Sequence, residues 1–273
     1  MQTTPHLFQK RLKKLGPNGR YLAFRLGYSL LGIGLFILLW VAVGYALFTR
    51  PGYEQFSGFL PVPTLEAFWG LLFEGQFWMS VWASIRRVII GITIAFIIGL
   101  PFGLLIGFYQ KLQLLTYTPV QFLRMISPLS WMPVALLVFH SFESAIYFLI
   151  TMATVWPIIL NTAHGVSQVN PHWVNMARNQ GAQDYQLLTR IVLPASIPYI
   201  LTSLRLALGV AWIVLVPAEF LGISSGLGYI INDARDTMEY DRLGAIIIAI
   251  GFVGFVLDGS IEVIQRMFSW NVA

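Results

Sequence analysis

The sequence of 273 residues contains no cysteine, and only 11% of its residues are charged. The missing cysteines exclude disulfides, thiolate metal sites and cysteine nucleophiles. Soluble globular chains carry about 25% charged residues, so this chain has too little polar surface to cover a soluble core of its size. A soluble enzyme and a nucleic-acid-binding protein are therefore excluded, although the formal net charge is +5.

Patterns for phosphate binding, metal binding and catalysis are also missing. The lysines are Lys10, Lys13, Lys14 and Lys111, and none lies in a phosphate loop of the form G-x-x-x-x-G-K-S/T. The four histidines are too scattered for a metal site. No candidate nucleophile occurs in a pattern with a general base that could activate it. We therefore expect no catalytic residues, no metal and no bound cofactor in this chain, and no ATP hydrolysis by the chain alone.

What the sequence does contain is hydrophobic residues, at 57%, gathered in long uncharged stretches. About 20 such residues cross the hydrocarbon core of a bilayer as a helix. Continuous apolar runs, rather than short alternating ones, favour helices over a barrel. We predict an all-α integral membrane protein with six transmembrane helices, at about 26–49, 88–110, 125–142, 144–160, 197–218 and 243–257.

The same pattern divides the chain into parts. Residues 1–25 form a basic segment, and residues 26–48 form a peripheral transmembrane helix that is too long for a cleavable signal peptide. Residues 49–82 form an outer loop, in which Thr64 as N-cap and Glu66 in the first turn predict a short interfacial helix. Residues 83–268 form the transmembrane core, interrupted by a long loop at 161–196.

The distribution of charge predicts how the chain lies in the membrane, because Lys and Arg collect on the cytoplasmic side. With the N-terminus inside, the inner segments hold most of the basic residues, including Lys111 and Arg124 after the second helix. The outer segments are then net acidic, although Arg86 and Arg87 lie at an outer helix end. Both termini and the loop 161–196 are expected to be cytoplasmic.

Small residues and prolines are concentrated in the central spans. Gly99, Gly103 and Gly107 follow one another at four-residue spacing, which lets two helix backbones approach closely in lipid. Pro128 and Pro133 interrupt the third span, and broken helices at membrane depth are tolerated where they face protein or a water-filled path. The central spans are therefore expected to form a conduit.

The loop 161–196 is too long for a simple connector. Asn170 followed by Pro171 predicts a helix start, and Gly181 permits a sharp turn. A second short helix is predicted from Asp184 to Val192, ended by Pro194. Two short helices at an angle would form a docking surface for another protein, whereas the alternative is an ordinary linker.

The order of residues in this loop resembles the EAA loop of ABC-importer permeases. The family pattern is Glu-Ala-Ala, three residues, Gly, nine residues and Ile-x-Leu-Pro. The matching positions here are Asn175, Met176, Ala177, Gly181, Ile191, Leu193 and Pro194. Both spacings are kept, but Asn175 and Met176 replace the Glu and the first Ala, so an ion pair made by that Glu has no counterpart here.

The resemblance extends from about residue 61 to residue 270, and within the family it is to the nitrate, bicarbonate, taurine and alkanesulfonate permeases. FLRMISPLSWMPVALLVF and LTSLRLALGVAWIVLVPAEFLG are two of the segments that carry it. After the third span many members have a Gly-rich turn, whereas this chain has FHSFES at 139–144.

The resemblance implies a type I importer permease with the MetI-like fold, in the bacterial inner membrane. It also implies its partners: a second permease copy in a homodimer, two cytoplasmic ATPase subunits that hold ATP and Mg, and an external solute-binding protein. It does not select the anion, because the solute-binding protein usually sets selectivity. The alternative function is an ATP-independent secondary transporter or channel.

Candidates for the translocation path are few, because charge inside the membrane is rare. Arg205 lies within the fifth span and is expected to face the bundle interior, where it could attract an oxyanion or pair with an acidic residue. Arg86 or Arg87 could draw an anion inward or anchor lipid headgroups. Glu219 is expected to pair with a basic residue near the outer gate.

Three further candidates lie beside the prolines of the third span. Ser127, Ser130 and Trp131 carry hydroxyl and indole donors that suit a small anion. The alternative is that the hydroxyls bond to the helix backbone and that Trp131 packs in the core.

Overall fold

The computed structural model describes residues 19–48 and 50–269, and this part of the chain contains helices and no strand. Five helices are each long and apolar enough to cross a membrane, and the number is six if the bent pair at 110–138 is counted as one span. The five are α2 (Gly19–Phe48), α4 (Gly75–Phe108), α7 (Phe142–Ser167), α10 (Leu193–Gly222) and α12 (Tyr240–Ser269). The predicted all-α fold is confirmed, whereas residues 1–18 of the predicted basic segment lie outside the described residues.

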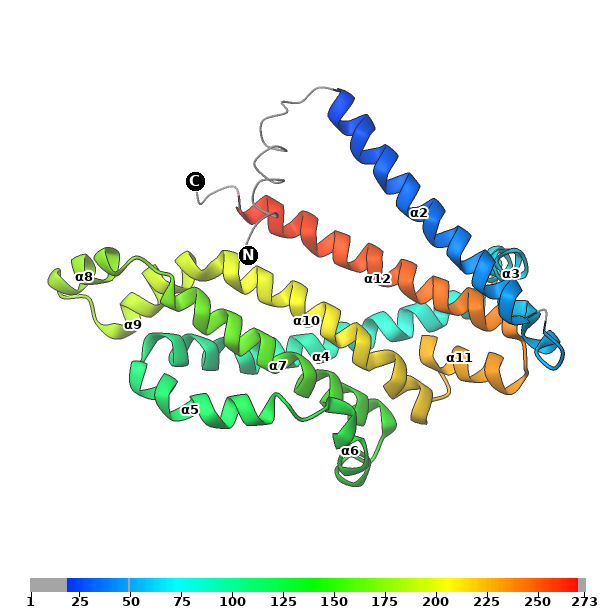
Figure 1. The fold of residues 1–273 in the computed structure, drawn as a ribbon. Helices are drawn as coiled ribbons and strands as arrows, with labels where there is room; N and C mark the ends of the chain where they lie inside the picture. The colour runs from blue at the N-terminus through cyan, green and yellow to red at the C-terminus, as the bar shows by residue number, and fades with distance from the viewer. Residues whose placement is uncertain (1–18, 49, 270–273) are drawn as a thin grey trace.

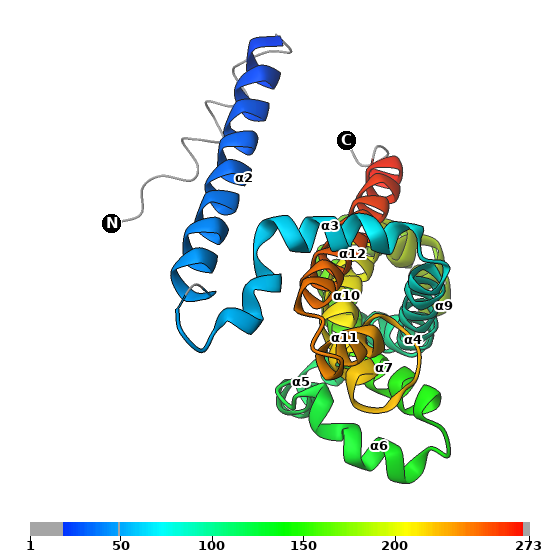
Figure 2. The same cartoon turned by 90° about the vertical axis from the view of Figure 1, so that its right-hand side faces the viewer.

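Helices α4, α7, α10 and α12 form the bundle, and α2 leans away from it (Figures 1 and 2). Near the C-terminal end of α2, the indole nitrogen of Trp40 donates to the carbonyl of Phe59 at 3.1 Å. The 3-10 helix η1 (Glu54–Phe59) and helix α3 (Pro61–Phe73) connect α2 to α4, and α3 packs against α12. The first span is thus peripheral, and its apolar stretch, Gly27–Phe48, agrees with the predicted 26–48, within a helix that begins at Gly19.

The tightest packing joins α4 to α7. A Cβ added to Gly91 would lie 2.5 Å from a side-chain carbon of Ile150, and one added to Gly103 would lie 2.8 Å from the carbonyl oxygen of Ile159. Gly107 makes a similar close approach one turn further on. The spacing of glycines in the sequence therefore marks the helix face where two backbones meet.

The third span is interrupted at Pro128, as its prolines predict, but it occupies residues 110–138 rather than 125–142. Helix α5 (Gln110–Leu123) is followed by the 3-10 helix η2 (Pro128–Trp131) and by α6 (Met132–Val138), and the two parts are bent by 81°. The break falls before Pro128, where Ser127 has φ −59° and ψ 128°. A residue that precedes proline is pushed out of the helical region, so the chain cannot continue straight.

The interfacial helix also begins elsewhere than predicted. Helix α3 starts at Pro61, with Leu60 at its N-cap, because proline at the first helical position has the required φ and no N–H to satisfy. Thr64 is buried, and its hydroxyl donates to the carbonyl of Gly58 at 3.0 Å. Thr64 therefore fastens α3 to η1 and is not an N-cap.

The predicted cytoplasmic loop contains helix α8 (Pro171–Asn179), helix α9 (Asp184–Leu187) and a π-helical turn η3 (Leu188–Val192). Pro194 does not end the second helix, because the wide π turn leads directly into α10 and places Pro194 in the first turn of that helix. Helix α11 (Leu227–Asp236) lies between α10 and α12. Helices α8 and α11 lie at opposite ends of the bundle, which are named the α8 end and the α11 end (Figure 1).

Candidate functional site

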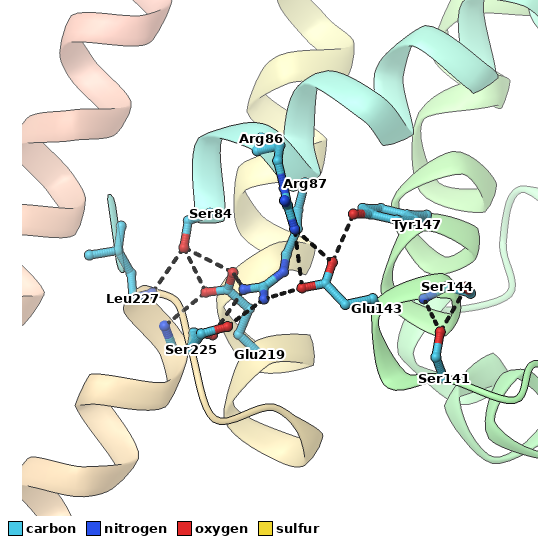
Figure 3. Close-up of polar contacts among 11 residues, drawn as sticks. Ser84, Arg86, Arg87, Ser141, Glu143, Ser144, Tyr147, Glu219, Ser225 and Leu227 are labelled. Carbon is cyan, nitrogen blue, oxygen red and sulfur yellow. Dashed lines mark hydrogen bonds and ion pairs between the residues drawn. The ribbon is translucent and has the colours of Figure 1, made fainter. Parts of the chain in front are cut away.

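A buried arginine at the α11 end connects four segments of the chain (Figure 3). The guanidinium of Arg87, on α4, is 0% exposed. Its Nη1 donates to Glu219 of α10 at 2.6 Å, and its Nη2 donates to Glu143 of α7 at 2.6 Å. The same two nitrogens donate to the carbonyl and the hydroxyl of Ser225 at 2.9 and 2.7 Å. Arg87 therefore holds α4, α7, α10 and the loop before α11 together.

Glu219 is fully buried and pairs with a basic residue, Arg87, as the sequence led us to expect. Besides Arg87, it accepts hydrogen bonds from the Ser84 hydroxyl at 2.8 Å and from the Gly228 amide at 3.0 Å. Ser84 in turn accepts from the amide of Leu227 at 2.9 Å. The carboxylate is thus fully paired, as a buried charge requires, whereas the buried Nε of Arg87 has no hydrogen-bond partner among the described residues.

Gly226 forms the corner that brings α11 against this cluster. Its φ is +104°, which side-chain-bearing residues rarely adopt. A Cβ at this position would lie 2.5 Å from Nη1 of Arg87 and 2.5 Å from the carboxyl carbon of Glu219. Glycine is therefore required both by the backbone conformation and by the space that the ion pair occupies.

Glu143 is the accessible member of the cluster. Its side chain is 36% exposed, and the hydroxyl of Tyr147 donates to it at 2.7 Å. Arg86 is half exposed and reaches Glu143 only at 3.5 Å. The structure thus places Arg86 at the edge of the cluster and its neighbour Arg87 at the centre, a role that the sequence analysis did not assign. The available signal was spacing, since Arg87 precedes Gly91 by four residues and shares its helix face.

Arg205 pairs with two acidic residues of α12. Its Nε and Nη2 donate to Asp258 at 2.8 and 2.6 Å, and Nη2 also donates to Glu262 at 2.9 Å. Close by, the Gln265 amide donates to the Thr202 hydroxyl at 2.8 Å, which adds a second connection between α10 and α12. Two roles were expected for Arg205, attraction of an oxyanion and pairing with an acidic residue. This geometry is that of an ion pair between two helices.

The three candidates of the third span lie at its bend. Ser127 and Ser130 are exposed, and Trp131 is half-buried against the core cluster that α7 and α10 form. The amide of Ser130 donates to the carbonyl of Ser127 at 3.0 Å. Trp131 therefore packs against the core, which is the alternative to anion contact expected from the sequence. The hydroxyls of Ser127 and Ser130 lie on the surface of this chain.

At the α8 end, the loop has the helix start and turn that the sequence predicts. The side chain of Asn170 accepts from the amide of His172 at 2.9 Å, and Gly181 has φ +85°. Across this turn Arg178 donates to Asp184 at 3.2 Å. The angle between α8 and α9 is therefore set by a left-handed glycine and one ion pair.

The residues of the EAA-like pattern differ in burial: some are exposed and others pack against the bundle. Asn175 and Met176 are exposed and Ala177 is half-buried on α8, while Gly181 and Pro194 are exposed. Ile191 and Leu193 pack against a buried cluster that includes Leu104 and Val166 of the bundle. The second half of the pattern thus anchors the loop, and the first half is presented outward. Beneath α8, Gly107, Val166 and Arg178 are among the residues lining an open cavity of about 400 Å³.

The described residues contain no group of three or more His, Asp or Glu side chains that could hold a metal ion. The charged clusters at Arg87 and Arg205 are instead made of arginines and carboxylates that satisfy one another. Their chemistry is that of fastening helices together, and neither includes an activated nucleophile.

Residues 99–270 match the family described as "Binding-protein-dependent transport system inner membrane component". The chain is 37% identical over 252 residues to the bicarbonate transport system permease protein CmpB of Synechococcus elongatus, covering 89% of each chain. It is 34% identical over 209 residues to the nitrate import permease protein NrtB of Leptolyngbya laminosa, covering 72% of this chain and 74% of that one. Among solved structures, the inward-facing MetNI methionine ABC transporter aligns with a TM-score of 0.61 at 16% identity, covering 69% of this chain and 94% of that one.

Proposed function

Because this chain belongs to the family of binding-protein-dependent transport system inner membrane components, we propose that it forms the membrane path for uptake of a small anion. The chain is an ABC importer permease and a multi-pass protein of the inner membrane. The proposed cargo is bicarbonate, nitrate or a sulfonate such as taurine. Similarity to a bicarbonate permease and to a nitrate permease supports this class of cargo and favours neither ion.

The observation that carries the proposal is the helical loop at the α8 end. Trp173, Met176 and Tyr185 are 53%, 59% and 75% exposed there, so the loop presents apolar side chains outward on a short, rigid frame. An exposed apolar surface of this kind is typical of a protein–protein contact. We assign it to a cytoplasmic ATPase subunit, which places the α8 end and both termini on the cytoplasmic side.

Energy from ATP then comes from outside this chain. The sequence has no phosphate loop, so two ATPase subunits would bind ATP and Mg and would grip one loop from each of two permease copies. The α11 end would face an external solute-binding protein, which delivers the anion. Ile191 and Leu193 join the loop to the bundle, so a movement of the ATPase subunits would reach α10 directly.

The test is reconstitution. The chain is purified with its ATPase subunits and solute-binding protein, placed in lipid vesicles, and assayed for uptake of labelled bicarbonate, nitrate and taurine with and without ATP. We expect uptake of one of these anions only when ATP and all subunits are present. Uptake by the chain alone, without ATPase subunits, would identify a secondary transporter or channel and would overturn the proposal.

A further inference from the structure

The bend of the third span lies near the middle of the membrane. Before the bend, Gln121 of α5 shares the lining of one cavity with Leu160 of α7. After the bend, Met132 belongs to the core cluster that residues 145–153 of α7 help to form. Residues 124–127 therefore lie level with about residues 153–160 of α7. Because α7 runs from Phe142 to Ser167, that level is close to its midpoint.

Arg124 lies at this bend, and its charge is uncompensated. Arg87 and Arg205, two arginines of the bundle helices α4 and α10, each contact two carboxylates. Among the described residues, no acidic side chain pairs with Arg124, which is exposed on this chain. From the sequence alone, Arg124 is predicted to lie in an inner loop, because the polar residues of α5 conceal that this helix belongs to the bent pair at 110–138.

An unpaired arginine at mid-membrane depth is too costly to face lipid, so it normally faces a water-filled path or the protein interior. Two hydroxyls stand beside it on the same bend, those of Ser127 and Ser130, both exposed. Within the described part of the chain neither hydroxyl has a hydrogen-bond partner of its own. The bend thus combines one free guanidinium with two free hydroxyls.

We propose that Arg124, Ser127 and Ser130 form a binding site for a small oxyanion within the translocation path. The guanidinium supplies charge-assisted donors in a planar fork, and the hydroxyls supply neutral donors, which together suit a planar or tetrahedral oxyanion. Without a carboxylate of its own, Arg124 accepts an anion without first breaking an ion pair. The inference rests on the proposed function, because only an anion importer requires a positive site at this depth.

The absence of cysteine in the sequence allows a test that does not depend on transport. In the assembled importer in membranes, Ser127→Cys is treated with an anionic and with a cationic thiosulfonate, and labelling of this chain is followed on a gel. Phe36→Cys, in the peripheral helix α2, is the lipid-facing control, and Tyr53→Cys, before η1, is the water-exposed control.

We expect Ser127→Cys to label at a rate near that of Tyr53→Cys and far above that of Phe36→Cys. The anionic reagent should react roughly sevenfold faster than the cationic one, as a unit charge on the order of 7 Å away in water predicts. Adding Arg124→Gln should remove this preference. Labelling as slow as that of Phe36→Cys, or equal rates for both reagents with Arg124 in place, would overturn the site.

Uptake into vesicles provides the second measurement. Arg124→Gln should lower anion uptake by about tenfold or more, because charge-assisted hydrogen bonds are lost, while ATP hydrolysis stimulated by the solute-binding protein stays within about twofold. Arg124→Lys keeps the charge and should retain more uptake. The matched control is Arg50→Gln, because the Arg50 side chain donates to the carbonyl of Ala46 near the α11 end and has no ion pair among the described residues.

Normal uptake by Arg124→Gln would contradict the site and leave the proposed function standing. If the unmodified importer takes up none of the tested anions, the proposed function fails instead. The labelling preference at Ser127→Cys then still reports whether a positive, water-accessible site exists at the bend.

Discussion

The buried carboxylate of Glu219 gives the sharpest prediction about stability. Glu219→Gln keeps the shape of the side chain but removes the charge that faces Arg87 at 2.6 Å. It also replaces one of the two acceptor oxygens with an amide group, so either the Gly228 amide or Nη1 of Arg87 loses its acceptor, whereas the Ser84 hydroxyl, which reaches both oxygens, keeps one. Arg87 keeps Glu143, which is half exposed and screened by solvent.

Removing one partner of a buried ion pair costs about 3–5 kcal/mol, and we expect the lower end because Glu143 remains. For a chain of this size, 1 kcal/mol shifts the melting temperature by roughly 2–4 °C, so Glu219→Gln should lower it by roughly 6–12 °C. Glu143→Gln is the matched control, since its carboxylate is 36% exposed and partly screened by solvent, so its loss should lower the melting temperature less than loss of the buried Glu219.

The assay is thermal unfolding of the purified importer in detergent, followed by the fluorescence of its tryptophans. The double variant Arg87→Met with Glu219→Leu should be more stable than the sum of the two single changes predicts, because no unpaired charge stays buried. Equal melting temperatures for Glu219→Gln and Glu143→Gln, or strict additivity in the double variant, would refute the reasoning.

Three further perturbations test other parts of the fold. Gly103→Ala should lower the melting temperature by several degrees, because its Cβ would lie 2.8 Å from a backbone oxygen, whereas Gly32→Ala, with open space around it, should not. Gly181→Val should lower uptake by about tenfold or more while ATP hydrolysis continues, because a β-branched residue opposes φ +85° at the turn. Equal loss of uptake and of ATP hydrolysis would count against a coupling role. Arg205→Gln should lower the melting temperature and leave the concentration of anion for half-maximal uptake unchanged, and adding Asp258→Asn should restore part of the stability. A large change in that concentration with normal stability would instead show that Arg205 contacts the anion.

The sequence predicts the helical spans well because its uncharged runs are long and lipid imposes a minimum length on them. It also predicts the face of α4 that meets another helix, because glycines four residues apart mark one helix face; that the partner is α7 comes from the structure. The turn at Gly181 and the helix start at Asn170 follow from local chemistry that needs no distant partner.

Other features could not be predicted because they depend on residues far apart in the sequence. Arg86 and Arg87 are adjacent, and only the rotation of about 100° per helical residue decides which one is buried. The partners of Arg87 lie 56 and 132 residues further along the chain. The depth of Arg124 was missed for a related reason, because α5 is less apolar in sequence than the other spans, and its level follows from the cavity that it lines together with α7.

Anion uptake driven by ATP tests the central claim most directly. Vesicles containing this chain, its ATPase subunits and a saturating solute-binding protein are supplied with labelled bicarbonate, nitrate or taurine. We predict uptake that starts on addition of ATP and Mg and stops when the ATPase subunits are inactivated. Uptake that continues unchanged without ATP, or a tagged chain that purifies without any ATPase subunit, would contradict its function as the permease of an ATP-driven importer.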